Sequence, residues 1–294
     1  MNDNYTTTVA EVLAVYDLHS HSNCSDGILP PEALVSRAKD KGVKHLALTD
    51  HDTTQGIKAA LTAAQVHDIE LIAGIELSCL WNGVGIHVLG LNIDIDHVAM
   101  LEAVQVQHDN RRLRSDKIAE RLAKKGIVNS LEGARKIAGD GVLGRPHFAA
   151  YMIEAGYVKN HEEAFKRYLG AGKIGDVKQM WPSIEQAVSW IVSAGGVAVL
   201  AHPDKYGLTR SKLKRLLDDF TEAGGQAMEL VSGLQTKQLT GNLLPLIKEY
   251  DLHASCGSDF HAPGRHWQEL GVCGYLAKDI PPVWALWQGA EQTA

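Results

Sequence analysis

Histidine and carboxylate residues gather at the ends of the short apolar segments of this sequence. His19 and His21 end the first segment two residues apart, and side chains at that spacing in an extended chain point the same way. Imidazole and carboxylate groups together suit Zn, Mn or Fe. The candidate ligands are His19, His21, Asp26, His51, Glu76, His87, His202, Asp259 and His261. This set exceeds the three or four ligands of one metal, and therefore predicts two or three ions that share carboxylates.

The segments that carry these residues alternate between strand and helix patterns. We expect strands at 12–18, 45–48, 71–75, 86–91, 197–201, 227–231 and 252–256, and helices at 31–41, 54–67, 183–194, 211–222 and 235–250. This alternation is typical of βαβ units with a parallel sheet. The carboxyl ends of parallel strands open on one side, where ligands bind, so we expect the candidate residues to converge there. His87 begins its strand instead of ending it, and fits this rule less well.

A long helical region interrupts the alternation. The sequence predicts helices at 97–124, 130–138, 146–155 and 161–169. We therefore expect one α/β body formed by residues 1–96 and 177–294, and a helical insertion domain formed by residues 97–176. Insertions on an α/β scaffold commonly form lids or caps over a substrate site.

The composition excludes several classes of protein. The 294 residues are 45% hydrophobic and 22% charged, which is ordinary for a globular chain and unlike a disordered or collagen-like one. The formal charge of −6 argues against a broad footprint for long duplex DNA. No apolar run is long enough to span a membrane, no basic secretory signal begins the chain, and the four cysteines form no CxxC pair. We expect a cytoplasmic protein with no membrane contact; its oligomeric state is not readable from the sequence.

Several motifs together resemble those of the PHP (polymerase and histidinol phosphatase) superfamily. The matching segments are 16–21 with 25–27, 49–53, 74–76 with His87, 201–203 and 257–261. They occur in the family's order and extend over the whole chain. Within the superfamily the sequence is most similar to the stand-alone bacterial branch of RNase AM, a 5′–3′ exoribonuclease, and the 3′,5′-nucleotide bisphosphatases.

The resemblance implies a distorted (β/α)7 PHP barrel with a helical cap, which hydrolyses phosphate esters at a trinuclear metal centre. It assigns all nine candidate ligands to that centre, and none of them is substituted in this sequence. The implied cofactor is Mn²⁺, as two or three ions, with Zn²⁺ or Fe²⁺ as alternatives. Asp26 and His202 are both candidates for the residue that supplies a proton to the leaving sugar oxygen, and the sequence does not choose between them.

The helical insertion carries basic residues suited to a phosphate. Arg111 and Arg114 lie three apart on one helix face, next to Arg112, and arginine forms forked contacts with phosphate. Arg145 and His147 lie at the predicted start of another helix, where backbone N–H groups favour anions. A solvated helix face is the ordinary alternative for such a run. In the resembling branch these segments hold the phosphate that is not cleaved.

The resemblance therefore implies a metal-dependent phosphoesterase that binds a terminal 5′-phosphate and hydrolyses the adjacent ester. The expected substrates are 5′-phosphorylated short RNA or RNA 5′ ends, and nucleoside 3′,5′-bisphosphates that yield the 5′-monophosphate. The rival activity is a phosphatase for small monoesters, such as histidinol phosphate, which needs no second phosphate clamp. A metal-dependent accessory module and a Zn amidohydrolase are further alternatives, because the bare ligand chemistry does not distinguish phosphorus from carbon substrates.

Overall fold

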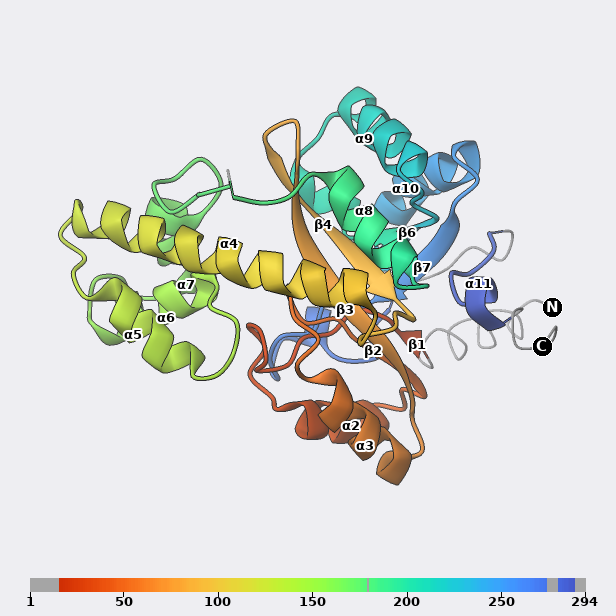
Figure 1. The fold of residues 1–294 in the computed structure, drawn as a ribbon, viewed down its shortest axis with the longest axis horizontal. Helices are drawn as coiled ribbons and strands as arrows, with labels where there is room; N and C mark the ends of the chain where they lie inside the picture. The colour runs from red at the N-terminus through yellow and green to blue at the C-terminus, as the bar shows by residue number, and fades with distance from the viewer. Residues whose placement is uncertain (1–15, 179, 274–279, 289–294) are drawn as a thin grey trace.

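Seven strands form one sheet in chain order in the computed structural model, which describes residues 16–178, 180–273 and 280–288 (Figure 1). The strands are β1 (Tyr16–Asp17), β2 (His45–Leu48), β3 (Glu70–Trp81), β4 (Val84–Leu91), β5 (Val197–Leu200), β6 (Ala227–Ser232) and β7 (His253–Gly257). The N–H of Leu18 donates to the carbonyl of Cys256 at 3.0 Å, and the N–H of His21 to that of Phe260 at 2.9 Å. These bonds join the first strand to the last, so the sheet closes almost completely into the predicted barrel. Residues 12–15 of the first expected strand lie outside the described residues.

The expected all-parallel sheet is wrong at one strand. β4 pairs antiparallel with both β3 and β5, whereas the other neighbouring pairs are parallel. A two-residue turn at Asn82 and Gly83, both with positive φ, reverses the chain between β3 and β4. The start of β4 therefore lies at the same rim as the carboxyl ends of the parallel strands. This reversal explains why His87, near the start of its strand, still belongs with the other candidate ligands.

Helices cover the outside of the barrel. They are α2 (Pro31–Asp40), α3 (Ile57–His67), α8 (Ile184–Ser193), α9 (Arg210–Glu222) and α10 (Lys237–Glu249), with a short α11 (Ala285–Gln288) and 3-10 turns η2 (Pro203–Tyr206) and η3 (His266–Gln268). Side-chain oxygens of Ser183, Thr209 and Thr236 accept hydrogen bonds from backbone N–H groups in the first turns of α8, α9 and α10. Such caps satisfy donors that a helix start leaves unpaired, and fix where each helix begins.

Successive side chains along each strand point alternately into two different cores, one inside the barrel and one outside it. Leu89 and Leu91 of β4 face the barrel interior together with residues of β2, β3, β5 and β6, whereas Ile86 and Val88 face the helices outside. The outer core includes Trp190 of α8 and Phe220 of α9. Both faces of each strand are therefore apolar near one end of the barrel, as is typical of sheets covered on both sides.

The helical insertion forms a separate layer at one end of a long helix. It consists of α4 (Val98–Ala123), α5 (Ser130–Ala138), α6 (Arg145–Glu154), α7 (His161–Ala164) and a π-helical turn η1 (Phe165–Leu169). Figure 1 shows α4 running from the barrel, where it lies beside α8, to the group of α5, α6 and α7. Met100 of α4 packs in the outer barrel core, and Ile118 packs with Phe148 in a core of the insertion. The division at residues 97 and 176 stays a prediction, since α4 contributes to both cores.

Phe148→Ala tests how much the insertion core contributes to stability. Phe148 is fully buried, so its loss leaves a cavity and should lower the free energy of unfolding by about 3–5 kcal/mol. Urea unfolding, followed by circular dichroism, measures the change. Leu113→Ala on the exposed face of α4 is the control, and should change stability by less than about 0.5 kcal/mol. A Phe148→Ala variant as stable as the parent would contradict the placement of Phe148 in a packed core of the insertion.

Candidate metal centre

The inner face of the barrel changes from apolar to ionisable toward one rim. Ile72 of β3, Leu89 of β4 and Ala227 of β6 belong to the interior core. Side chains at even spacing along a strand share a face. The interior positions nearer the rim are therefore Glu76 in β3, four residues beyond Ile72, His87, two before Leu89, and Glu229 in β6, two beyond Ala227. Strand alternation alone thus places two carboxylates and an imidazole inside the barrel mouth.

Glu76 is the central carboxylate of this site and is only 1% exposed. Its two oxygens face five histidine nitrogens, with the closest distances 2.8 Å to His87, 2.9 Å to His51, 3.0 Å to His202, 3.3 Å to His21 and 3.4 Å to His19. These histidines come from β4 and from the segments that follow β1, β2 and β5. The structure therefore brings together residues spread over most of the sequence, as the strand pattern predicted.

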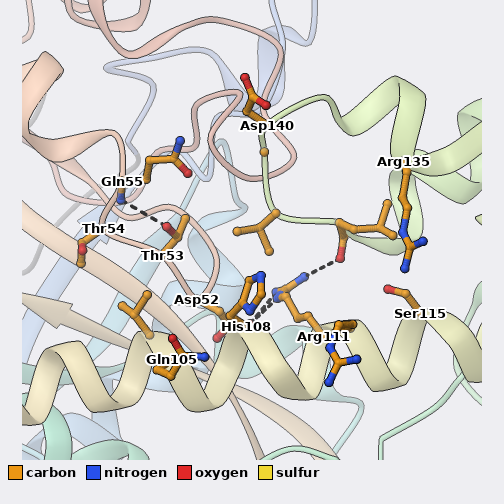
Figure 2. Close-up of a pocket in the computed structure, with 15 residues that line it drawn as sticks. Asp52, Thr53, Thr54, Gln55, Gln105, His108, Arg111, Ser115, Arg135 and Asp140 are labelled. Atoms are coloured by element: carbon orange, nitrogen blue, oxygen red, sulfur yellow. Dashed lines mark hydrogen bonds and ion pairs between the residues drawn. The ribbon is translucent and has the colours of Figure 1, made fainter. Parts of the chain in front are cut away.

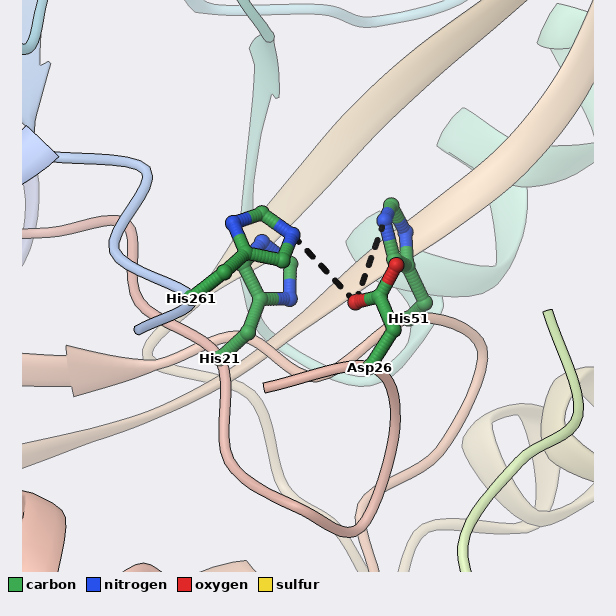
Figure 3. Close-up of side chains that lie close together, drawn as sticks. All are labelled: His21, Asp26, His51 and His261. Carbon is green, nitrogen blue, oxygen red and sulfur yellow. Dashed lines mark ion pairs between the residues drawn. The ribbon is translucent and has the colours of Figure 1, made fainter. Parts of the chain in front are cut away.

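Asp26 forms a second group with His51, His21 and His261 (Figure 3). Its Oδ1 atom lies 3.2 Å from Nε2 of His261 and 3.9 Å from Nε2 of His51. Asp259 lies between the two groups, with Oδ1 3.5 Å from Nε2 of His21 and 3.6 Å from Nε2 of His19. All nine predicted ligands thus line one connected cluster.

Hydrogen bonds to buried polar groups fix the loop that presents Asp26. Asp50 accepts bonds from the backbone N–H of Ser22 at 2.8 Å and from the hydroxyl of Ser25 at 2.6 Å. Gly27 packs so closely on the chain that a Cβ would lie 2.2 Å from the carbonyl oxygen of His21. Only glycine fits there without moving the loop, so the turn holds Asp26 against the histidines.

Glu229 was missed by the sequence analysis. Its Oε1 lies 2.9 Å from Nδ1 of His19, and its Oε2 accepts a 2.6 Å bond from the backbone N–H of His202. His202 has φ of +26°, a backbone conformation that non-glycine residues rarely adopt, and Glu229 holds it there. A carboxylate at this position orients a ligating imidazole by fixing which nitrogen carries the proton. The available signal was a charged residue in an otherwise apolar strand.

The geometry of the cluster fits metal ions. Three groups can each gather one atom per residue within 4.8 Å: His21, Asp26, His51 and His261; His19, His21 and Glu76; and His51, Glu76 and His87. Ligand atoms about 2.1 Å from one ion lie about 3.0–3.4 Å from each other, close to the separations around Glu76. Atoms Nδ1 of His21 and Oε2 of Glu76 are buried without a well-directed hydrogen bond among the described residues. Imidazole and carboxylate atoms so placed support the use of metal ions.

The ionisation of the cluster shows how strongly its charges interact. Burial opposes the ionisation of Glu76, Asp26 and Asp259, but the neighbouring histidines outweigh it and hold the pKa of each carboxyl well below its usual range. Burial would lower the pKa of His261, but Asp26 and Asp259 raise it to about 9. Burial and the charge of His261 lower the pKa of His21 to about 3. Protons on some histidines thus balance the carboxylates, and a bound metal must displace them.

A cavity of about 360 Å³ adjoins the cluster. We call it the arginine cavity, because Arg111, Arg114 and Arg145 of the insertion line it. Arg111 and Arg114 of α4 lie 5.3 and 5.0 Å from the ring centre of Trp181, a residue that the sequence analysis did not single out. Arg145 of α6 lies close enough that its charge acts on both. Lys178 also lines the cavity. The insertion therefore places a concentration of positive charge beside the metal cluster.

The arginines differ in how much of their hydrogen-bonding capacity is already used. Arg111 is paired with the buried carboxylate of Asp52, to which both Nε and a terminal nitrogen lie at 2.6 Å. Arg114 donates from Nε to the carbonyl of Val177 at 2.7 Å, and its terminal nitrogens have no hydrogen bond or ion pair with any described residue. Burial and the charges of Arg145 and Arg111 lower the pKa of Arg114 to about 9. An anion that enters this cavity would relieve that repulsion.

Arg112 is exposed and does not line the cavity beside the metal cluster. It lines a different cavity of about 620 Å³, which Figure 2 shows between α4 and the loop around Asp140, with His108 and Arg135 on its wall. Arg111 also reaches this cavity. His147 lines a third cavity, of about 930 Å³, together with Asp26 and His261 of the cluster. The Nδ1 of His147 accepts the N–H of Gly144 at 3.0 Å, which caps α6. The structure thus brings Arg111, Arg114 and Arg145 to the cluster, and does not bring Arg112 there.

The barrel and its buried cluster together define an α/β-barrel protein with a site suited to metal ions, and the relatives below identify it as a hydrolase. The sequence pattern of the PHP domain matches residues 17–192. The chain is 46% identical to a 5′–3′ exoribonuclease of Haemophilus influenzae, over 92% of this chain and 97% of that protein. It is 37% identical to a 3′,5′-nucleoside bisphosphate phosphatase of Chromobacterium violaceum, over 92% of this chain and 94% of that protein. The chain therefore belongs to the PHP domain family.

A solved structure supports the same assignment. The structure of an amidohydrolase from Chromobacterium violaceum, with bound sulfate and no metal, superposes with a TM-score of 0.87 at 36% identity, covering 93% of this chain and 95% of that one. The predicted barrel and the predicted family are thus confirmed. No helix of the described residues has the length and apolar character needed to cross a membrane.

Glu229→Gln should weaken metal binding without removing a ligand. The variant keeps the size of the side chain but loses the charge that orients His19, and changes to such supporting groups weaken metal affinity about 10- to 100-fold. Calorimetric titration of Mn²⁺ into the metal-free protein measures this affinity. Glu222→Gln, an exposed change on α9, should bind as the parent does. Equal affinities for Glu229→Gln and the parent would contradict the role assigned to Glu229.

Metal removal should lower the melting temperature. A metal that binds only the folded state stabilises it by about 2.7 kcal/mol at a hundred times its Kd, which corresponds to roughly 5–10 °C for a chain of this size. Scanning calorimetry with Mn²⁺ and with a chelator measures the shift. His19→Ala should abolish most of it, whereas His67→Ala, at the end of α3 and outside the cluster, should retain it. An unchanged melting temperature on chelation contradicts the metal centre.

Proposed function

We propose that this protein is a metal-dependent phosphoesterase that holds a terminal 5′-phosphate and hydrolyses the adjacent phosphate ester. It acts as a 5′–3′ exoribonuclease on short RNA or RNA 5′ ends, and as a bisphosphatase that converts a nucleoside 3′,5′-bisphosphate to the 5′-monophosphate. The observation that carries this proposal is the position of Arg114 and Arg145 beside the metal cluster. The names of two relatives, an exoribonuclease and a bisphosphate phosphatase, support both activities.

The arginine cavity is suited to a phosphate that is retained in the product. Arg114 offers two terminal nitrogens without other polar partners among the described residues, and forked donors match phosphate oxygens. Lys178 adds charge, although Asp176 pairs with it at 3.0 Å. A cavity of about 360 Å³ lies at the small end of the range for ligand sites, as a single nucleotide requires. The 5′-phosphate binds among the arginines, and this places the phosphate on the 3′ oxygen at the cluster.

The nine clustered ligands hold the metal ions, with Mn²⁺ as the proposed cofactor and Zn²⁺ or Fe²⁺ as alternatives. Such ions, when bound, lower the pKa of water and offset the charge of the reacting phosphate. The chain's own residues hold the ester between the cavity and the cluster. Asp26 and His202 are the residues proposed to handle the proton that the 3′ oxygen requires as its bond to phosphorus breaks. Both residues are suited to this because they line the arginine cavity where it meets the cluster.

Both proposed substrates use the same chemistry. In each, water attacks phosphorus and the bond to the 3′ oxygen breaks, so the first nucleotide leaves as its 5′-monophosphate. The other product is inorganic phosphate from a bisphosphate, or a chain with a new 5′-phosphate from RNA. A phosphatase for small monoesters such as histidinol phosphate has no use for a second anion site, which Arg114 and Arg145 supply.

Arg114→Ala should remove the preference for a second phosphate. Mn-loaded protein receives adenosine 3′,5′-bisphosphate, adenosine 3′-monophosphate and a 5′-phosphorylated RNA oligomer in competition. Hydrogen bonds to charged groups contribute about 1.5–3 kcal/mol, so kcat/KM for the bisphosphate and the RNA should fall about 10- to 100-fold, and that for the 3′-monophosphate should change little.

Arg121→Ala is the matched control for that experiment. Arg121 lies on the same helix and donates to the carbonyl of Ile174 at 3.0 Å, but it does not line the arginine cavity. It should keep the preference of the parent. Turnover of histidinol phosphate alone, or equal losses for all three substrates in Arg114→Ala, would contradict the proposed function.

A further inference from the structure

Besides the arginine cavity, a second cavity adjoins the metal cluster, and it is not the one that Arg112 lines. Its volume is about 930 Å³, and it lies between the insertion and the segment that follows β7. Asp26 and His261 of the cluster are among its lining residues. Asp26, Pro146 and Phe165 line both this cavity and the arginine cavity, so the two meet at the cluster.

The second cavity carries positive charge that the protein does not use. Arg265 is exposed, and its guanidinium makes no hydrogen bond or ion pair with any described residue. His161 at the start of α7 also lines the cavity, where burial and the charge of Arg265 lower its pKa. Outside the cluster, Asp140 is the one acidic residue among the described lining residues. The cavity is polar and accessible, unlike a groove for an apolar partner.

Chain polarity determines what this cavity can hold. A 5′-phosphate among the arginines and a reacting phosphate at the cluster leave room for one nucleotide in the arginine cavity. In an RNA substrate the chain continues beyond the reacting phosphate and must leave the cluster by another route. The second cavity has the required contact with the cluster and about 2.6 times the volume of the arginine cavity.

We infer that the second cavity binds the RNA chain downstream of the cleaved phosphate, and that Arg265 contacts a phosphate of that chain. This inference rests on the proposed function and adds to it a site for the retained product. A nucleoside bisphosphate ends at the reacting phosphate and does not reach Arg265. The cavity therefore separates the affinity for RNA from the affinity for the free nucleotide.

The test uses the full Mn-loaded chain and a 5′-phosphorylated RNA pentamer with a 3′ fluorescein and a non-hydrolysable methylenephosphonate as its first linkage. Fluorescence anisotropy measures its Kd from low to high salt. Arg265→Ala should weaken binding roughly fivefold and reduce the slope of log K against log salt by about 0.7, the value for one phosphate contact on a single strand. Hydrolysis of adenosine 3′,5′-bisphosphate should stay within twofold of the parent.

Two variants serve as controls. Arg265→Lys keeps the charge and should keep the salt slope. Arg215→Ala removes an exposed arginine from α9, which lines none of the three cavities described here, and should bind the pentamer as the parent does.

The outcomes separate this inference from the proposed function. If the parent cleaves RNA and bisphosphate but Arg265→Ala leaves both the pentamer Kd and the salt slope unchanged, the inference is wrong and the proposed function stands. If the parent binds the pentamer no more tightly than a dinucleotide with the same first linkage, the cavity does not hold the downstream chain. If the parent cleaves neither substrate, the proposed function fails and the inference fails with it.

Discussion

The buried carboxylate of Glu76 is the group on which the rest of the site depends. A carboxylate taken out of water costs several kcal/mol unless opposite charges and hydrogen bonds compensate for it. Five histidines from four separate parts of the barrel converge on its two oxygens. That convergence requires the closed sheet, and it requires the reversed strand β4 that brings His87 to the same rim. Metal ions are the natural partners of such a cluster, because they supply positive charge that can replace the protons on the histidines and balance the packed acids.

The insertion is fixed to this site through a second buried carboxylate. Asp52 has φ of +57° and accepts hydrogen bonds from the N–H of Ser78, the amide of Gln107 and the guanidinium of Arg111. It lies one residue after His51, a candidate metal ligand, while Gln107 and Arg111 belong to α4. One barrel loop thus contributes both to the cluster and to the attachment of the insertion. The arginine cavity is consequently held at a set position relative to the cluster.

The sequence predicted local elements and their order well, because alternating and helical periodicity are properties of each segment. Helix 130–138 and strand 45–48 match the structure at both ends. The direction of β4 was not predictable in this way, since it depends on pairing with β3 and β5. Glu229 and Trp181 were missed for a related reason. Each takes its role from residues distant in the sequence, and neither stands in a motif that would have drawn attention to it.

In the proposed function, the pairing of Arg111 with Asp52 also limits how tightly the arginines hold the phosphate that is retained. Arg111 and Arg114 share one helix face, so the spacing alone makes them equivalent, yet only Arg114 has uncommitted terminal nitrogens among the described residues. Interactions with a phosphate that does not react stabilise the bound substrate and the transition state alike, and the product keeps that phosphate. A clamp of three free guanidinium groups would therefore favour the product complex as much as the substrate complex. If the proposed function holds, the pairing of Arg111 with Asp52 leaves enough charge to select a phosphorylated end and limits the affinity for the nucleotide that must be released.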